Sequence, residues 1–149
     1  MLISTRSRYA LRVLARMANS MNKGDKHPIS LAFLSEQEQV SVRYLEQIFG
    51  LLRRKGVVKG KRGPGGGYVL GMSPEDISLF HIFSILETDF LPATCMAGEE
   101  SCSPEKSFSQ VHCSLEDTCV TRPLWITLRD MFCSYMNEKT LKDLIEGNV

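Results

Sequence analysis

The sequence lacks several features that mark other classes of protein. Its 149 residues contain no run of 18 apolar side chains, so no membrane-spanning helix is expected. The first residues, 1–6, lack the apolar stretch of a secretory signal. We therefore expect a cytoplasmic protein, in which thiols stay reduced. The five cysteines are then better explained as ligands or sensors than as disulfides.

Two missing motifs narrow the chemistry further. The glycine-rich stretch 63–67 is not part of a G-x-x-x-x-G-K-[ST] string, and no helix is expected directly after it, which argues against a nucleotide-binding loop. No C-x2-C pair is present, which argues against a zinc ribbon and against a thiol oxidoreductase. We therefore expect no enzymatic activity, with an oxidoreductase as the less favoured alternative.

Charge is unevenly distributed along the chain, although the net charge is only +1. Residues 1–71 carry 13 Lys and Arg against 4 Asp and Glu, or +9, whereas residues 72–149 carry 5 against 13, or −8. A basic half of this kind is typical of a polyanion-binding surface. Nucleic acid is the favoured polyanion, because no basic amphipathic helix with exposed aromatics indicates a membrane surface.

Apolar periodicity predicts a mainly helical chain with one hairpin. Helices are expected over 4–21, 31–38, 42–55, 73–87, 121–135 and 140–146, with Ser4 or Thr5 as the N-cap of the first and Ser30 as the N-cap of the second. Residues 57–70 read as strand, glycine-rich turn and strand. Residues 90–120 have no periodicity and carry four cysteines, so a functional loop is expected there. Arg8, Arg12 and Arg16 form a stripe that we interpret as a solvated helix face.

The expected fold class is mainly α with a small β-hairpin, in the form of a winged helix-turn-helix DNA-binding domain plus a long dimerisation helix. Residues 1–72 would form the DNA-binding domain and 73–89 a connecting helix. Residues 90–120 would form the cysteine-bearing loop. Residues 121–149 would form the dimerisation helix and a C-terminal helix. Cys133 and His81 are expected to be structural residues within helices.

The order of the first elements favours DNA binding. The second helix of a helix-turn-helix enters the major groove, where Arg reads guanine and Gln reads adenine. A narrow hairpin tip can carry Arg into the minor groove, and a helix N-terminus favours phosphate. The predicted DNA-binding residues are Ser4, Thr5, Arg6, Ser41, Arg43, Tyr44, Glu46, Gln47, Lys61, Arg62, Gly63 and Pro64.

Four cysteines form the candidate metal site: Cys95, Cys102, Cys113 and Cys119. Four thiolates satisfy either a two-iron or a four-iron cluster, and wide spacing on a loop is compatible with this. Zinc and a metal-free thiol or disulfide switch remain as alternatives. Cys119 precedes a predicted helix start, where the helix dipole favours a thiolate.

The chain resembles the IscR/NsrR family of bacterial winged-helix transcription regulators, many of them iron–sulfur sensors. The resemblance runs from T-R-S-R-Y at 5–9 through S-V-R-Y-L-E-Q-I-F at 41–49 and R-G-P-G-G-G-Y at 62–68 to Leu124-Trp125. It implies that Arg62, Gly63 and Pro64 form the wing that enters the minor groove. It also implies that Ser41, Arg43, Tyr44 and Glu46 occupy base- and backbone-reading positions.

The same resemblance assigns three cluster ligands, Cys95, Cys113 and Cys119. The chain departs from its relatives at the fourth, because Arg122 stands where IscR relatives have His and Arg8 stands near the Asp of NsrR relatives. We infer that Cys102 is the fourth ligand of a 2Fe–2S or 4Fe–4S cluster, with His112 in reserve.

The function expected from the sequence is a homodimeric DNA-binding regulator, most simply a repressor of a palindromic operator. Its DNA affinity would be controlled by an iron–sulfur cluster or by thiol redox state. A cluster-free regulator with a cysteine thiol or disulfide switch is the alternative.

Overall fold

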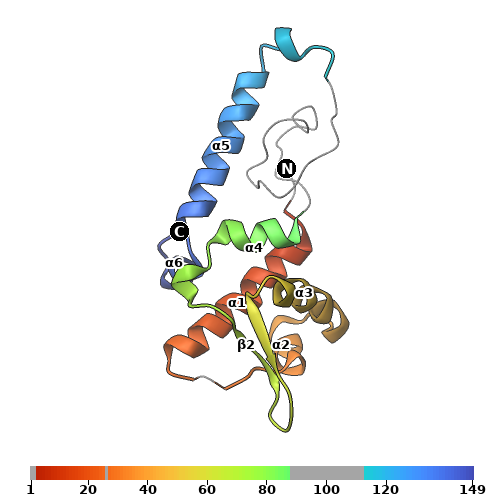
Figure 1. The fold of residues 1–149 in the computed structure, drawn as a ribbon, viewed down its shortest axis with the longest axis vertical. Helices are drawn as coiled ribbons and strands as arrows, with labels where there is room; N and C mark the ends of the chain where they lie inside the picture. Colours follow the sequence, from red (N-terminus) through yellow and green to blue (C-terminus); the bar gives the residue numbers. More distant parts are fainter. Residues whose placement is uncertain (1–2, 26, 88–112) are drawn as a thin grey trace.

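The computed structural model describes residues 3–25, 27–87 and 113–149 and confirms the predicted fold class, a mainly helical winged helix-turn-helix chain (Figure 1). The elements are α1 (Thr5–Asn22), α2 (Leu31–Glu38), α3 (Val42–Arg54), β1 (Val58–Lys61), β2 (Gly67–Leu70), the 3-10 helix η1 (Pro74–Asp76), α4 (Leu79–Leu86), the 3-10 helix η3 (Glu116–Thr118), α5 (Arg122–Glu138) and α6 (Leu141–Glu146). Within the described residues, no helix combines the length and apolarity needed to cross a bilayer.

Serine hydroxyls begin the first three helices, which confirms the predicted caps at Ser4 and Ser30 and adds a third at Ser41. The side chains of Ser4, Ser30 and Ser41 each accept a hydrogen bond from the backbone N–H three residues on, at 3.2–3.3 Å. Each cap satisfies one N–H that the helix leaves without a partner. Between α2 and α3, Gln39 adopts the left-handed conformation with φ 54°. This residue ends α2 and lets α3 start in a new direction.

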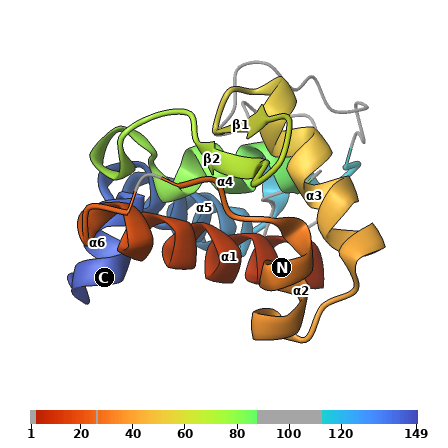
Figure 2. The ribbon, with the colours of Figure 1, turned by 90° about the horizontal axis from the view of Figure 1, so that it is seen from below.

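Helices α1 and α3 each contribute one buried apolar stripe to a shared core. Helix α1 packs against α2, α4, α6 and β2, and α3 packs against α2, α4 and β1. Figure 2 shows α1 crossing the molecule, with α6 near its C-terminal end. The buried residues of these two helices are Ala10, Val13, Leu14, Met17, Ala18, Leu45, Ile48, Phe49 and Leu52.

The hairpin is joined to the segment that precedes α2. Strands β1 and β2 pair antiparallel, with Val58 opposite Leu70 and Lys61 opposite Gly67. Ile29 adds a bridge to Tyr68 through two hydrogen bonds of 2.8 and 2.9 Å. A Cβ at Gly67 would lie 2.5 Å from the carbonyl oxygen of Ile29, so only glycine permits this close approach.

The expectation of one continuous helix over 73–87 is wrong. The chain forms η1, then an extended break at Ile77 and Ser78, and only then α4. The break is stabilised by pairing with the chain after α5, because Leu141 N–H donates to Ile77 and Leu79 N–H donates to Lys139, both at 2.8 Å. Ile77 is fully buried. Tertiary pairing therefore overrides the local helical pattern.

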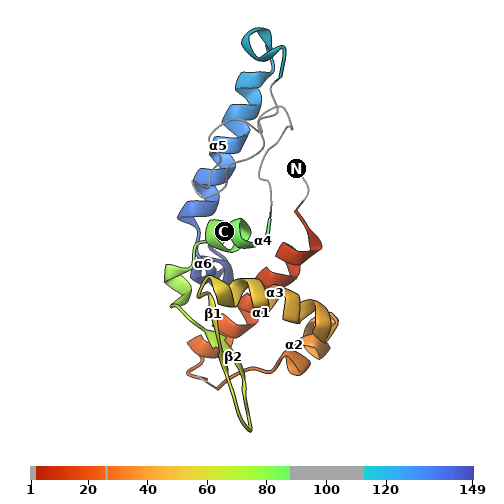
Figure 3. The same ribbon diagram turned by 45° about the vertical axis from the view of Figure 1, so that its right-hand side comes forward.

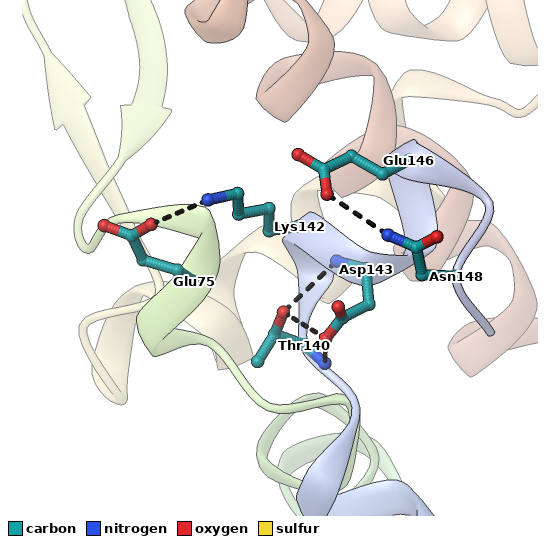
Figure 4. Close-up of polar contacts among 6 residues, drawn as sticks. All are labelled: Glu75, Thr140, Lys142, Asp143, Glu146 and Asn148. Atoms are coloured by element: carbon teal, nitrogen blue, oxygen red, sulfur yellow. Dashed lines mark hydrogen bonds and ion pairs between the residues drawn. The ribbon is translucent and has the colours of Figure 1, made fainter.

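A capping box starts helix α6, and an ion pair joins the helix to η1 (Figure 4). Thr140 Oγ1 accepts from the Asp143 N–H at 3.2 Å, and Asp143 Oδ2 accepts from the Thr140 N–H at 2.8 Å. Lys142 Nζ lies 3.2 Å from Glu75 Oε2. The box satisfies two N–H groups at the helix start. The C-terminal helix is thereby fixed to the connection between the hairpin and α4.

Helix α5 extends away from the other helices, and the hairpin projects from the opposite end of the molecule (Figure 1 and Figure 3). Met136 is its one buried residue. Four large apolar side chains at helical spacing are exposed: Leu124 at 52%, Leu128 at 44%, Met131 at 64% and Tyr135 at 46%. An apolar stripe of this kind on a helix is typical of an interaction surface.

The α1 arginine stripe is exposed at Arg8 and Arg12, as the interpretation of a solvated face requires, but two of its members also have a structural partner. Arg12 and Arg16 both bind the carboxylate of Glu38, each at 2.7 Å. Glu38 is 5% exposed, at the end of α2. A buried carboxylate requires compensating charge, and two arginines supply it. The stripe therefore fastens α1 to the helix-turn-helix.

A second carboxylate ties the start of α1 to the end of α4. Glu87 Oε1 accepts hydrogen bonds from the Ser4 backbone N–H at 3.0 Å and from Ser4 Oγ at 2.6 Å. Burial raises the pKa of Glu87, but hydrogen bonding by Ser4 and Ser7 and the charge of Arg6 together outweigh it. The net pKa of Glu87 lies below its ordinary value. The ionised carboxylate therefore stabilises the fold.

Glu87→Gln is expected to lower the free energy of unfolding by about 1 kcal/mol at neutral pH, because charge-assisted hydrogen bonds to Ser4 are weakened. The folded-state pKa is below the unfolded one, so this contribution is full above the unfolded pKa and is lost as pH falls through the folded pKa. Urea unfolding of both proteins across acidic pH measures it. Glu36→Gln, an exposed position on α2, is the control. A difference that persists unchanged at the most acidic pH would contradict this assignment.

Candidate nucleic-acid interface

Helix α3 presents most of its predicted base-reading residues to solvent. Ser41, Arg43, Glu46 and Gln47 are exposed, on the side of α3 opposite its buried apolar residues. The Ser41 hydroxyl also accepts the capping hydrogen bond from the Tyr44 N–H. This separation of faces follows from the 3.6-residue period of the helix. The exposed N-terminal turn is the part of a recognition helix that contacts base edges.

Tyr44 and Thr5 are brought together although 39 residues separate them. Their hydroxyl oxygens lie 3.3 Å apart, and the Tyr44 ring meets Tyr9 edge to face with centroids 6.1 Å apart. Tyr44 is half-buried as a result. The predicted residues at the start of α1 and the start of α3 therefore form one continuous surface.

Ser4 and Arg6 are less available to DNA than the sequence predicts. The Ser4 hydroxyl donates to Glu87 and accepts from the Ser7 N–H at 3.3 Å. The guanidinium of Arg6 lies 3.5 Å from the Leu86 carbonyl oxygen, although Arg6 is exposed. Both side chains thus contact the end of α4. Their role in positioning the start of α1 has direct structural support.

The tip of the hairpin exposes Lys61, Arg62, Gly63 and Pro64. Gly63 has φ 102°, and its carbonyl accepts a hydrogen bond from the Gly66 N–H at 2.8 Å, which closes the turn. Glycine is required where φ is this positive. The turn is consequently narrow, with the basic side chains at its entry.

Three basic side chains on α3 and the hairpin are available to bind an external partner. Among the described residues, Arg43, Lys61 and Arg62 form no ion pair. Arg12 and Arg16, by contrast, are occupied by Glu38. The basic charge of this half of the chain is thus divided between an internal structural use and an exposed surface.

The hairpin is aligned with α3 by an aromatic contact. The rings of Phe49 and Tyr68 lie with centroids 4.8 Å apart at 61°. Helix α3 also packs against β1, and the two elements lie side by side in Figure 2. Sequence reasoning missed Tyr68 as an anchor. Its position directly after the glycine-rich turn, in phase with buried Val58, was the available signal.

Two of the four predicted metal ligands lie within the described residues. Cys113 and Cys119 are half-buried and free. Cys95, Cys102 and the reserve ligand His112 lie outside the described residues. Within the described part, no group of three or more potential ligands gathers around one point. Cys133 lies on α5, where it packs against the core as a half-buried residue. It is disulfide-bonded, so the expectation that the cysteines are not in disulfides is wrong for this residue.

The surroundings of Cys119 lower the pKa of its thiol. Its Sγ is 3.3 Å from Thr121 Oγ1. The hydrogen bond from Thr121 and backbone N–H groups at the start of α5 lower the pKa of Cys119, and the charge of Arg122 contributes. Arg122 also forms an ion pair with Glu116. A thiolate is the form that binds metal or reacts with oxidants.

Comparison with known proteins identifies the family. The model of the Rrf2 family, described as an iron-dependent transcriptional regulator, matches residues 3–147. The IscR regulator of Pectobacterium atrosepticum is 34% identical over 147 residues, covering 99% of this chain and 80% of that protein. A putative HTH-type regulator of Haemophilus influenzae is 35% identical, covering 97% of this chain and 87% of that protein.

Solved structures agree with this assignment. CymR of B. subtilis, a global cysteine regulator, has a TM-score of 0.74 and 32% identity, covering 98% of this chain and 97% of that one. The T. potens IscR structure has a TM-score of 0.72 and 26% identity, covering all of this chain and 89% of that one. These relatives are transcription regulators rather than enzymes. The chain is therefore a DNA-binding transcriptional regulator of the Rrf2 family.

Proposed function

We propose that this regulator binds a palindromic operator with α3 in the major groove and the hairpin tip in the adjacent minor groove. The observation that carries the proposal is the pair of exposed basic elements, Arg43 on α3 and Lys61-Arg62 on the hairpin, held in one unit by the contact of Phe49 with Tyr68. Phosphate contacts from these cations would supply affinity, and base edges would supply specificity.

Arg62→Ala is expected to weaken operator binding by about 1–3 kcal/mol, because a minor-groove arginine contributes both charge and shape recognition. Fluorescence anisotropy across a salt series measures the affinity and its slope. The control is Lys142→Gln, which removes one positive charge from α6. Operator affinity that is the same for Arg62→Ala and the wild type would refute the role of the hairpin.

The homodimer is proposed to form through α5. Its exposed apolar residues, Leu124, Leu128, Met131 and Tyr135, would be buried against the same stripe of a second chain. A two-fold symmetric pair would present two α3 helices about one helical turn of DNA apart. Sedimentation equilibrium measures the association, and a purely monomeric protein would contradict it.

An iron–sulfur cluster is proposed as the sensor, with Cys95, Cys102, Cys113 and Cys119 as ligands. Support comes from the family's description as iron-dependent and from relatives named IscR. The two described cysteines are suitable iron ligands. Cys113 is a free thiol, and the pKa of Cys119 is lowered, which favours the thiolate that binds metal. A bound cluster would make the protein sensitive to oxidants and to the availability of iron. The protein's own contribution is to hold the thiolates beside the start of α5.

Anaerobically purified protein is expected to show visible absorption from a cluster, together with iron and sulfide on analysis. Cys119→Ala should lose the cluster, because a ligand is removed, whereas Ser134→Ala on α5 should keep it. Cys102→Ala that retains a full cluster would place the fourth ligand elsewhere. Colourless protein that also fails reconstitution would contradict the cluster proposal and leave a thiol switch as the sensor.

Localisation follows from the same proposal. A regulator of this kind acts where the chromosome is, so we place it in the cytoplasm of a bacterial cell, acting as a repressor.

A further inference from the structure

A cavity of about 210 Å³ lies beneath the hairpin. It is bounded by the C-terminal part of α1, the segment leading to α2 and the two strands. Its apolar lining comes from Met17, Met21, Ile29, Tyr68 and Leu70. Drug-sized pockets are larger, about 300–1,000 Å³. The space therefore suits a small metabolite.

Charged groups of both signs line the same cavity. Asp25 and His27 come from the segment after α1, and Lys61 comes from the end of β1. All three are exposed, and among the described residues neither Asp25 nor Lys61 takes part in an ion pair. Asp25 Oδ1 accepts the His27 backbone N–H at 2.9 Å, which fixes the carboxylate beside the cavity. An unpaired anion and an unpaired cation thus line one apolar space.

We propose that this cavity is a binding site for a free α-amino acid with an apolar side chain. The ammonium group would pair with Asp25, and the carboxylate would pair with Lys61, with His27 as a second donor. The side chain would lie against Met17 and Met21, whose unbranched thioethers adapt to different shapes. A nucleotide is disfavoured, because one lysine beside an aspartate does not compensate several phosphate charges.

The cavity is mechanically connected to the DNA-binding hairpin. Ile29 and Tyr68 both line it and are joined by two backbone hydrogen bonds. Lys61 is at once a cavity residue and the first residue of the predicted hairpin tip. A bound carboxylate would draw the Lys61 ammonium from DNA phosphate. This consequence rests on the proposed operator binding, whereas the binding site itself does not.

Binding is tested without DNA. Full-length protein carrying 13C-methyl methionine is titrated with L-methionine, L-leucine and L-valine, and Met17 and Met21 are assigned by Met→Leu variants. We expect shifts confined to these two methyl groups with at least one amino acid. Pentanoate, which lacks the ammonium, and butylamine, which lacks the carboxylate, are expected to bind at least tenfold more weakly. Absence of shifts with all three amino acids would overturn the proposal.

Variants test the contribution of the charged side chains and that of the cavity volume separately. Asp25→Asn keeps an oxygen acceptor for the His27 N–H and is expected to weaken amino-acid binding about tenfold, as is Lys61→Gln. Lys59→Gln, on the same strand but outside the lining, should bind as the wild type. Ser20→Phe fills the cavity and should abolish the shifts, whereas Asn22→Phe should not; circular dichroism verifies folding. Unchanged binding in Asp25→Asn and Lys61→Gln would refute the site.

The regulatory consequence has its own readout. Operator affinity of the wild type is expected to fall about tenfold with the bound amino acid, and affinity of Ser20→Phe should not respond. Methyl shifts without any DNA binding would contradict the proposed function and leave the amino-acid site standing. DNA binding without methyl shifts would overturn the site alone.

Discussion

The arrangement of the DNA-binding surface depends on the placement of Tyr68. Its backbone pairs with Ile29, and its ring packs on Phe49 of α3. A two-stranded hairpin is marginally stable by itself, so it needs such contacts to hold a direction. Gly67 permits the close approach to Ile29. The basic residues Lys61 and Arg62 lie at the exposed tip of the hairpin, directly before the glycine-rich turn. The exposed face of α3 and the hairpin tip are consequently fixed relative to each other.

Two carboxylates connect this unit to the rest of the chain. Glu38 fastens α1 to α2 through two arginines, and Glu87 fastens the start of α1 to the end of α4. The contact of Thr5 with Tyr44 then continues from α1 to α3. In the proposed function, the cysteine-bearing segment connects the end of α4 to the start of α5 and includes Cys119. A change there would reach α3 through contacts that the structure shows.

Sequence reasoning predicted most of the helices, the caps at Ser4 and Ser30 and the hairpin, because each depends on local pattern. It also predicted that α3 would expose Arg43 and Gln47 opposite its apolar face. It did not predict the break at Ile77, which depends on pairing with a segment more than 60 residues away. It missed the pairing of Arg12 and Arg16 with Glu38, because a carboxylate's burial is a tertiary property. The hydrogen bonds between Ser4 and Glu87 could not be predicted for the same reason.

Hydroxyl-radical footprinting on a duplex selected from a random library tests the central account most directly. The account predicts a symmetric pattern of protected sugars, in two segments whose centres lie about 34 Å apart, with adjacent minor grooves protected by the hairpin. An unprotected duplex, or protection of a single unpaired segment, would contradict the proposed dimeric winged-helix binding.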